Sequence, residues 1–379
     1  MRYFNTEGLC DPDIHYMVNL EKRLRTIRER YVERGSYFVI NRARQYGKTT
    51  TLWMLDDYLK DDYFVISLDF QALSTADFQD EYAFTRAFMR VFGEAMQEWE
   101  ASVEAKEIFC AFQKEQEKKT LGEMFMLLSQ VCKAASKPVV MMIDEVDSAS
   151  NNQVFIDFLA QLRLYYLKRR KKPIFRSVIL VGVYDIKNLK LKMRPEEEHQ
   201  YNSPWNIAAN FDLDMNFSAE QIGGMLWEYE ADHRTGMDVD EMAREIYRYT
   251  SGYPYLVSLI CKIIDETLPA EYEPSDGHGI WTREGIAEAV KIILKMKTPL
   301  FESMAKQLDS YPDLREMLED VIYRGKRIPF SPDTKSINVG MMFGFLRDWD
   351  GQVAVSNRLF EMRMLNMFIT EESVNNGAF

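Results

Sequence analysis

The feature that most constrains the fold is the stretch from Tyr37 to Thr50, in which an apolar run precedes a polar turn and Gly47-Lys48-Thr49. The apolar run predicts a buried strand, and the residues after the turn predict a helix. A glycine at this turn lets the backbone approach a phosphate, and the amides that start the helix point at the anion. The stretch therefore predicts strand, phosphate loop and helix, with Lys48 reaching the terminal phosphates and Thr49 ligating magnesium.

The loop pattern is incomplete, because its full form has a glycine five residues before Gly47 and this chain has Arg42 there. Average composition produces Gly-Lys-Ser/Thr by chance in roughly one chain in five of this length, so the tripeptide alone is weak support. The alternative interpretation is a helix N-terminus with an exposed lysine. The loop residues that we assign to nucleotide binding are Arg44, Gln45, Tyr46, Gly47, Lys48, Thr49 and Thr50.

A second stretch, Lys137 to Glu145, contains five consecutive apolar residues followed by two acids. This is the pattern of a buried parallel strand that delivers carboxylates at its C-terminal edge. Open α/β sheets bind ligands at that edge, so Asp144 is expected to help hold magnesium beside the phosphate loop, and Glu145 to polarise the attacking water. A solvated loop is the alternative. The candidate catalytic residues are thus Glu145 and Lys48, and the candidate metal ligands are Thr49 and Asp144.

Composition indicates a globular protein of two or three domains, since 46% of the 379 residues are hydrophobic and 28% are charged. No apolar run approaches the roughly 20 residues of a membrane span, and the start of the chain lacks the apolar core of a signal peptide. The expected location is the cytoplasm, with no membrane partner. The net charge of -12 argues against general nucleic-acid wrapping, although a local basic face would survive that average. Neither a disulfide framework nor a zinc site is indicated by Cys10, Cys110, Cys132 and Cys261 or by His15, His199, His233 and His278.

The order of elements after the phosphate loop alternates between strand and helix, which predicts parallel strands joined by right-handed crossovers. The expected strands are 63–70, 137–143 and 177–182, and the expected helices are 20–33, 81–99, 104–135 and 154–167. Tyr184 and Asp185 follow the last of these strands and are candidates for sensing the terminal phosphate. Past Phe211 the alternation stops. A small helical domain is expected there, with helices at 220–233, 239–249, 255–268 and 281–295.

A basic run, Lys168 to Lys172, follows the helix expected at 154–167. It could screen the carbonyls at the helix end, bind nucleic acid, or present an arginine to the nucleotide of a neighbouring subunit. A solvated helix end is the favoured interpretation. The candidates for an arginine finger, chosen from their position after the Asp-Glu strand, are Arg163, Arg169 and Arg170.

The C-terminal part of the chain has an element order that resembles a winged helix. Its expected elements are helices at 300–308 and 314–324, a short strand near 327–330, a helix at 338–346, a hairpin around 349–352 and a helix at 357–368. The helix before the hairpin has almost no donors to bases or phosphates, which favours packing or protein contact over reading of DNA.

Together these motifs, with the turn Gly252-Tyr253-Pro254, resemble the AAA-like ATP-binding proteins of bacteria, relatives of the STAND and origin-recognition ATPases. The resemblance implies an α/β fold, in which a parallel P-loop sheet with flanking helices is followed by a helical lid and a winged-helix-like domain. It also implies that the Gly-x-Pro turn of the lid packs near the nucleotide base, which adds Pro254 to the binding residues. The expected domains are 1–215 for the P-loop core, 216–298 for the lid and 299–379 for the winged-helix-like domain.

The function that this resemblance implies is ATP binding between sheet and lid, with ATP and Mg2+ as cofactors. Our leading hypothesis is a magnesium-dependent ATPase that acts as a nucleotide-driven conformational switch. One alternative is a slow or non-hydrolysing nucleotide-bound scaffold whose winged helix binds a protein partner; Arg42 motivates it. Another is an origin-recognition-like DNA-binding ATPase, by analogy alone. The expected partners are ATP or ADP and an unknown protein client; the resemblance allows a homo-oligomer, and DNA is not favoured.

Overall fold

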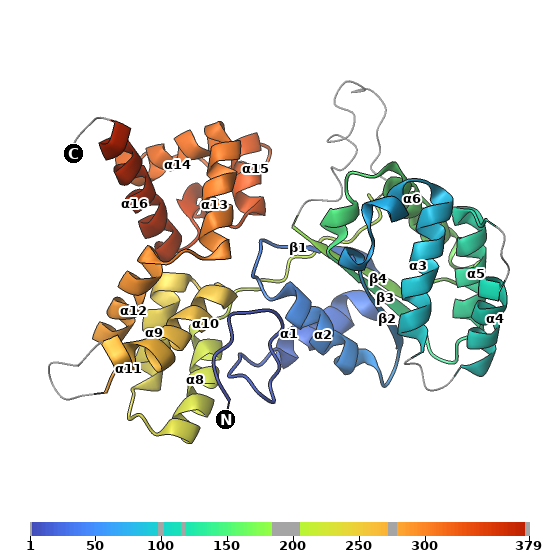
Figure 1. The fold of residues 1–379 in the computed structure, drawn as a ribbon, viewed down its shortest axis with the longest axis horizontal. Coiled ribbons are helices and arrows are strands. Elements are labelled where there is room, and N and C mark those ends of the chain that lie inside the picture. Colours follow the sequence, from blue (N-terminus) through green and yellow to red (C-terminus); the bar gives the residue numbers. More distant parts are fainter. Residues whose placement is uncertain (1, 98–101, 115–117, 184–204, 272–278, 376–379) are drawn as a thin grey trace. The chain divides into compact units, whose positions relative to one another are not determined.

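The computed structural model describes residues 2–97, 102–114, 118–183, 205–271 and 279–375, which form two units (Figure 1). The sheet unit comprises Glu21–Asn41 and Thr51–Leu213, and the helical unit comprises Met1–Leu20, Arg42–Thr50 and Asp214–Phe379. The chain therefore passes between the units four times, and the phosphate loop belongs to the helical unit. The expected boundaries of three domains, 1–215, 216–298 and 299–379, stay predictions.

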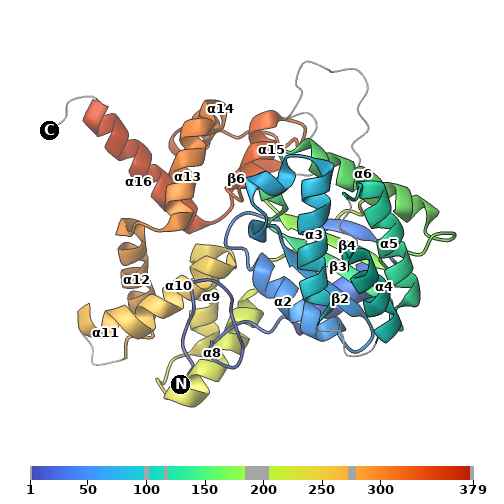
Figure 2. The same cartoon turned by 45° about the vertical axis from the view of Figure 1, so that its right-hand side comes forward.

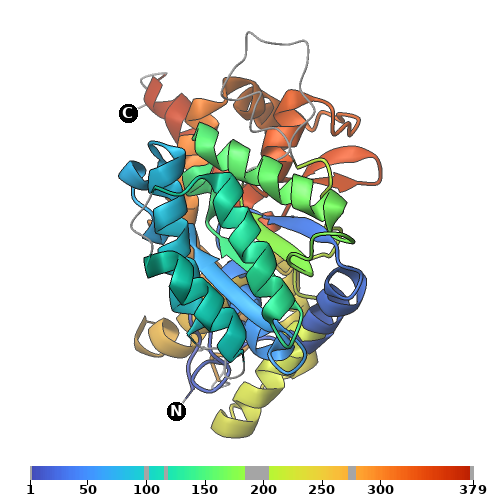
Figure 3. The same ribbon diagram turned by 90° about the vertical axis from the view of Figure 1, so that its right-hand side faces the viewer.

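Four parallel strands form the sheet, in the order β1-β4-β3-β2. The two central strands, β3 and β4, are buried at every residue because helices cover both faces of the sheet (Figure 3). An isolated parallel bridge between Phe38 and Ala209 continues the pairing on the outer side of β1. The predicted parallel α/β sheet is thus confirmed. The strands are β1 (Tyr37–Asn41), β2 (Phe64–Asp69), β3 (Val139–Asp144) and β4 (Ser177–Gly182).

One face of the sheet is covered by four helices: α3 (Glu81–Met96), α4 (Val103–Lys114), α5 (Leu121–Ala134) and α6 (Gln153–Lys168). Alternate residues of each strand enter this core, including Val139, Met141 and Ile143 of β3. The prediction of one bent helix over 104–135 is wrong. Residues 118–120 are not helical, and a new helix, α5, begins after Thr120, which forms a capping box with Glu123.

The opposite face is covered by the start of the sheet unit and by the part of α2 (Lys48–Leu59) that belongs to it. The first helix is α1 (Glu21–Ile27), which continues as a π-helical turn, Arg28–Val32. Tyr31 of that turn packs on Phe38 of β1 with ring centroids 4.6 Å apart, and Phe38 stacks on Phe211. Aromatic packing therefore fixes the entry to the sheet beside the strand that leads to the phosphate loop.

The predicted helical bundle lies in the helical unit and contains α8 (Ala219–His233), α9 (Val239–Thr250), α10 (Pro254–Lys262), α11 (Leu268–Glu271) and α12 (Arg283–Lys295). A π-helical turn, Ile263–Thr267, joins α10 to α11. Ser218 caps α8 as predicted, in a capping box with Gln221. The bundle also holds the N-terminal segment, because the rings of Phe4 and Tyr16 lie 5.0 and 5.2 Å from that of Tyr229.

Asp232 anchors the N-terminal segment by accepting hydrogen bonds from the Tyr16 hydroxyl (2.8 Å) and from Arg2 (3.1 Å). The Tyr16 hydrogen bond, followed by that of Arg2, lowers the pKa of Asp232 below its usual 3.8. The folded state therefore binds a proton at Asp232 more weakly than the unfolded state does. The ionised Asp232 stabilises the fold at pH values above its usual pKa, and this contribution is lost as the pH falls through the lowered pKa of the folded state.

This linkage predicts the pH dependence of the Asp232→Asn variant. Its Tm is expected to lie below that of the parent protein by a constant gap between about pH 5 and about pH 7, and the gap is expected to close below about pH 4. Thermal unfolding across this pH range measures the gap. A gap that stays constant down to about pH 3 would show that the Asp232 charge does not hold the segment.

The rest of the helical unit, seen in Figure 2, contains α13 (Pro299–Ser310), α14 (Pro312–Arg324), α15 (Lys335–Met342), a hairpin of β5 (Leu346–Trp349) and β6 (Gln352–Val355), and α16 (Arg358–Asn375). The helix predicted to extend to Leu346 ends at Met342, because Gly344 adopts a left-handed conformation and Leu346 starts β5. The strand predicted near 327–330 is reduced to an isolated bridge between Pro329 and Gln352. The assignment of this region as a winged helix stays a prediction.

Candidate functional site

The phosphate loop leaves β1 at Arg42 and ends at Gly47, directly before α2. Gln45 and Gly47 both have positive φ, at 59° and 69°. Glycine adopts this conformation without strain, whereas a residue with a side chain does so at a cost. A Cβ at Gly47 would have no atom within 4 Å, so a ligand could approach the backbone closely at this residue.

Lys48, the first residue of α2, folds back into its own loop and is 8% exposed. Its Nζ donates hydrogen bonds to the carbonyl oxygens of Arg42 and Ala43, each at 2.9 Å. A buried ammonium needs such partners, and phosphate oxygens could replace the carbonyls. Of the next two residues, Thr49 is exposed and Thr50 is buried, with its Oγ1 accepting a hydrogen bond from the amide of Cys10 (3.3 Å).

Tyr46 and Tyr253 join the phosphate loop to the bundle within the helical unit. Their ring centroids lie 4.4 Å apart, and the Tyr253 hydroxyl donates a hydrogen bond to the carbonyl of Arg44 (2.5 Å). Burial raises the pKa of Tyr46 to about 12, with Asp214 adding to the shift, and burial also raises the pKa of Tyr253. Both phenols are therefore neutral near neutral pH, so Tyr253 keeps its hydrogen to donate.

Gly252 and Pro254 flank Tyr253 and set the position of this turn. Gly252 has φ of 76° and its carbonyl accepts a hydrogen bond from the amide of Phe217 (2.8 Å). Pro254 starts α10, where its missing amide hydrogen costs nothing. The turn therefore holds Tyr253 against the loop at a fixed point of the bundle.

A second contact reaches the loop from the C-terminal part of the helical unit. A Cβ built on Gly344 would lie 3.0 Å from the Cβ of Ala43 and 3.4 Å from the ring of Tyr46. Tyr253 also packs edge-on against Phe360 of α16, with centroids 5.3 Å apart. The loop thus contacts both the turn before α10 and the segment between α15 and β5.

In the sheet unit, Asp144 and Glu145 lie at the C-terminal end of β3. Asp144 is 8% exposed and accepts a hydrogen bond from the amide of Glu145 (2.9 Å). Glu145 has φ of 52°, a left-handed conformation that is strained for a residue with a side chain. Such strain gathers at functional sites, and here it turns the chain immediately after the buried carboxylate.

The register of the strands brings the end of β1 to the same edge. Ile40 pairs with Val181 of β4, and Leu180 pairs with Ile143 of β3, so Asp144 is level with the last residues of β1. Strand β1 therefore ends at the edge of the sheet where the carboxylates lie. This is the edge at which open parallel sheets bind ligands.

A comparison with protein families matches residues 7–271 to the model described as AAA-like domain. The chain belongs to this family. Its fold is also that of the Walker-type ATPase paby2304 of Pyrococcus abyssi, with a TM-score of 0.63 at 13% identity over 96% of this chain and 99% of that one. Lower similarity is found to ORC2 of Aeropyrum pernix, with a TM-score of 0.48 at 10% identity over 93% and 95% of the two chains. No curated protein matches the chain.

The predicted resemblance to the AAA-like family is thereby confirmed. Two acidic residues at the same sheet edge were not predicted. Asp69 ends β2 in register with Asp144, and Asp147 accepts a hydrogen bond from the amide of Val183 (2.6 Å) just after β4. Asp69 could have been predicted, because it is an acid at the end of an apolar strand. Asp147 could not, because its position depends on the left-handed turn at Glu145.

The structure gives less information on the residues predicted to sense the terminal phosphate or to serve as an arginine finger. Tyr184 and Asp185 lie outside the described residues. Arg169 packs its guanidinium 3.8 Å from the ring centroid of Tyr166, and Arg170 is exposed. In the described part of the chain, no cluster of three or more His, Cys, Asp or Glu side chains could hold a metal by itself, and no helix has the length and apolar character needed to cross a membrane.

Proposed function

We propose that this AAA-like protein is a magnesium-dependent ATPase that works as a nucleotide-driven conformational switch. The observation that carries the proposal is the contact of the phosphate loop with two other parts of the helical unit, through Tyr253 and Gly344. A change in the loop on binding phosphate would alter both contacts directly. A switch needs an element of this kind, whose equilibrium the ligand biases.

The phosphate oxygens of ATP would be bound by the loop amides and by Lys48. The ammonium would exchange the carbonyls of Arg42 and Ala43 for phosphate oxygens, which are charged and make stronger hydrogen bonds. Thr49 would ligate magnesium, and Asp144 would hold the ion through water, as Mg2+ keeps much of its hydration shell in such sites. Glu145 would polarise the attacking water.

The remaining loop residues and the lid turn would shape the nucleotide pocket. The backbone from Arg44 to Gly47 would wrap the phosphates, with Tyr46 held by its ring contact with Tyr253. Pro254 would approach the base, as the family resemblance implies. Thr50 would contribute to nucleotide binding indirectly, by fixing the phosphate loop to the N-terminal segment. Its hydroxyl already accepts a hydrogen bond from the backbone amide of Cys10.

The Glu145→Gln variant tests the chemical step. Its side chain keeps the size of glutamate and loses the basic carboxylate, so phosphate release is expected to fall roughly 100-fold or more while ATP binding persists. The measurement is isothermal titration with ATP and magnesium, followed by phosphate release on the same nucleotide-stripped samples. Unchanged release would refute the role of Glu145.

The switch is tested by hydrogen exchange at residues 252–262 and 343–360. Exchange is expected to differ between the ATP-loaded Glu145→Gln variant and the ADP-loaded parent, because the phosphate loop contacts these segments through Tyr253 and Gly344. If hydrogen exchange were identical in the two states while the parent protein hydrolysed ATP, the protein would be an ATPase without this conformational switch.

A second candidate is a scaffold that binds nucleotide tightly and hydrolyses it negligibly. Arg42 in place of the usual loop glycine favours it, as does the binding of Lys48 by its own loop. At most one phosphate released per protein molecule, with nucleotide retained through purification, would support the scaffold. A winged-helix-like domain would then present the partner surface.

A further inference from the structure

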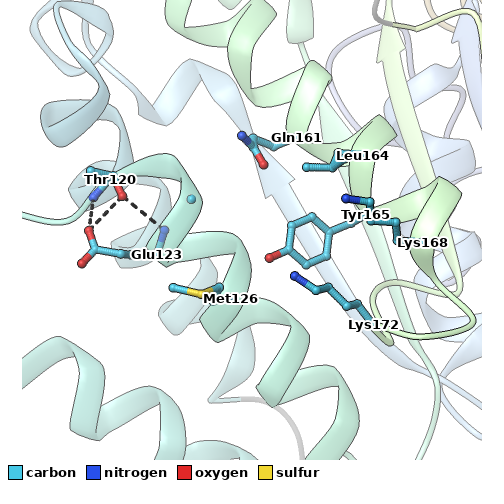
Figure 4. A pocket seen from close by; sticks show the side chains of 9 residues that line it. Thr120, Glu123, Met126, Gln161, Leu164, Tyr165, Lys168 and Lys172 are labelled. Atoms are coloured by element: carbon cyan, nitrogen blue, oxygen red, sulfur yellow. Dashed lines mark hydrogen bonds between the residues drawn. The ribbon is translucent and has the colours of Figure 1, made fainter.

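A groove opens between the start of α5 and the end of α6, on the outer side of the helices that cover the sheet (Figure 4). Its volume is about 360 Å³, within the range of sites that accept a ligand or a few side chains. Tyr165 and Lys172 point from the α6 side toward Met126 on α5 (Figure 4). The lining residues are Thr120, Gly122, Glu123, Met126, Gln161, Leu164, Tyr165, Lys168 and Lys172.

The floor of the groove is apolar and exposed. Met126 is 52% exposed and Leu164 is 40% exposed. The ring of Tyr165 is buried beneath them, although it contributes to the wall. Apolar side chains gathered at the surface of a chain with net charge -12 suit an interface better than open solvent.

The rim of the groove is basic. Lys168 and Lys172 line it and belong to the run of five consecutive cations from Lys168 to Lys172. In the part of the chain that the structure describes, none of these five forms an ion pair with a carboxylate. One or two cations suffice to interact with the carbonyls at a helix end, so five in succession exceed that role.

Among the described residues that line the groove, one carries a carboxylate, Glu123, and it belongs to the cap of its own helix. Glu123 accepts hydrogen bonds from the amide and the hydroxyl of Thr120, both at 2.8 Å. The hydrogen bond from the Thr120 amide, followed by that from the Thr120 hydroxyl, lowers the pKa of the Glu123 carboxyl. Glu123 is therefore an ionised acceptor in the cap of α5. Across the groove, the Lys172 ammonium lies 5.6 Å from the centroid of the Tyr165 ring. Neither Lys168 nor Lys172 forms an ion pair with Glu123 or another described carboxylate, so both charges can interact with an external anion.

We propose that this groove binds an acidic segment of a partner protein, with a large apolar side chain inserted between Met126 and Leu164 and carboxylates against Lys168 and Lys172. An apolar anchor in a pocket ringed by charge is the usual plan of a selective protein interface. Nucleic acid fits less well, because single strands bind by stacking bases on exposed rings and Tyr165 is only 5% exposed. The surface belongs to the sheet unit, and the inference does not rest on the proposed ATPase activity.

A random ten-residue peptide library displayed on phage, selected against the immobilised full chain, provides the probe. The enriched peptides are expected to combine aspartate or glutamate with leucine, phenylalanine or isoleucine. The most enriched peptide is then labelled, and its affinity is measured by fluorescence anisotropy. No enrichment, or enrichment without acidic residues, overturns the proposal.

Variants then locate the binding site of that peptide. The double variant Lys168→Glu with Lys172→Glu is expected to raise the Kd at least about tenfold, since two favourable charge pairs become repulsive. Leu164→Ser is expected to raise it about tenfold by removing the anchor contact. The matched controls are Arg170→Glu with Lys171→Glu, which change the same charge in the same run, and Leu167→Ser; none of these residues lines the groove.

The controls are expected to change the Kd by less than about threefold. Equal weakening by both double variants would mean general attraction to a basic surface and would overturn the groove assignment. A labelled 20-nucleotide single strand that binds more tightly than the peptide, and is lost in the Lys168 and Lys172 variant, would assign the surface to nucleic acid. Circular dichroism and Tm of each variant exclude misfolding as the cause.

Discussion

Lys48→Ala is expected to raise the Kd for ATP by about 100-fold or more. The ammonium would make two charge-assisted hydrogen bonds to phosphate, each contributing about 1.5–3 kcal/mol, and a loss of about 3 kcal/mol corresponds to roughly two powers of ten in affinity. The measurement is isothermal titration of nucleotide-stripped protein with ATP and magnesium. Phosphate release is expected to fall with binding, since the same group stabilises charge in the transition state.

The matched control is Lys60→Ala, just after the other end of α2. Lys60 pairs with Asp57 and its side chain is 63% exposed, so its loss removes one positive charge without touching the phosphate loop. ATP binding by this variant is expected to equal that of the parent. If Lys48→Ala bound ATP as the parent does while remaining folded, the ammonium would be a structural group that holds the carbonyls of Arg42 and Ala43, and the loop would not be a phosphate site.

Gly252→Ala is expected to lower the free energy of unfolding of the helical unit by about 3–5 kcal/mol. The methyl group would lie 1.9 Å from the carbonyl oxygen of Phe217 and 2.8 Å from its amide nitrogen, so backbone atoms must move apart. The movement breaks the hydrogen bond from the Phe217 amide to the Gly252 carbonyl. The left-handed conformation at φ of 76° adds about 1 kcal/mol for a residue with a side chain.

Gly236→Ala separates these two costs. Gly236 has φ of 78°, and a Cβ there would have no atom within 4 Å. This variant is therefore expected to lose only about 1 kcal/mol. Urea unfolding followed by circular dichroism compares the two variants with the parent. Equal destabilisation would mean that strain in φ dominates and that the contact between Gly252 and Phe217 relaxes without cost.

The P-loop sheet could be predicted because its signals are local. An apolar run between polar turns identifies β3, and the acids at its end place Asp144 and Glu145 at the sheet edge whatever the rest of the chain does. The same holds for Lys48, which sits between a strand and a helix of clear pattern. The capping boxes at Ser218 and Thr120 are local signals too, and the second could have divided the helix predicted over 104–135.

The contacts that support the switch could not be predicted, because they join residues about 200 or more positions apart. Nothing near Arg44 in the sequence indicates that its carbonyl accepts a hydrogen bond from Tyr253. Packing alone also decides that Gly344 lies against Ala43. The end of α15 is different, since a glycine two residues past Met342 is a common helix stop and carried a usable signal.

The two units are interleaved along the chain, and this limits both the order in which they can fold and the fragments that can be expressed separately. Because Arg42–Thr50 belongs to the helical unit while the strand before it belongs to the sheet unit, neither unit is a continuous piece of chain. A fragment that ends near residue 213 would contain every strand of the sheet, yet its loop would lack the Tyr253 ring and hydroxyl that hold it. The contacts of the phosphate loop with Tyr253 and Gly344 can therefore form only after synthesis has passed Gly344, and their long sequence separation is expected to make them late in folding.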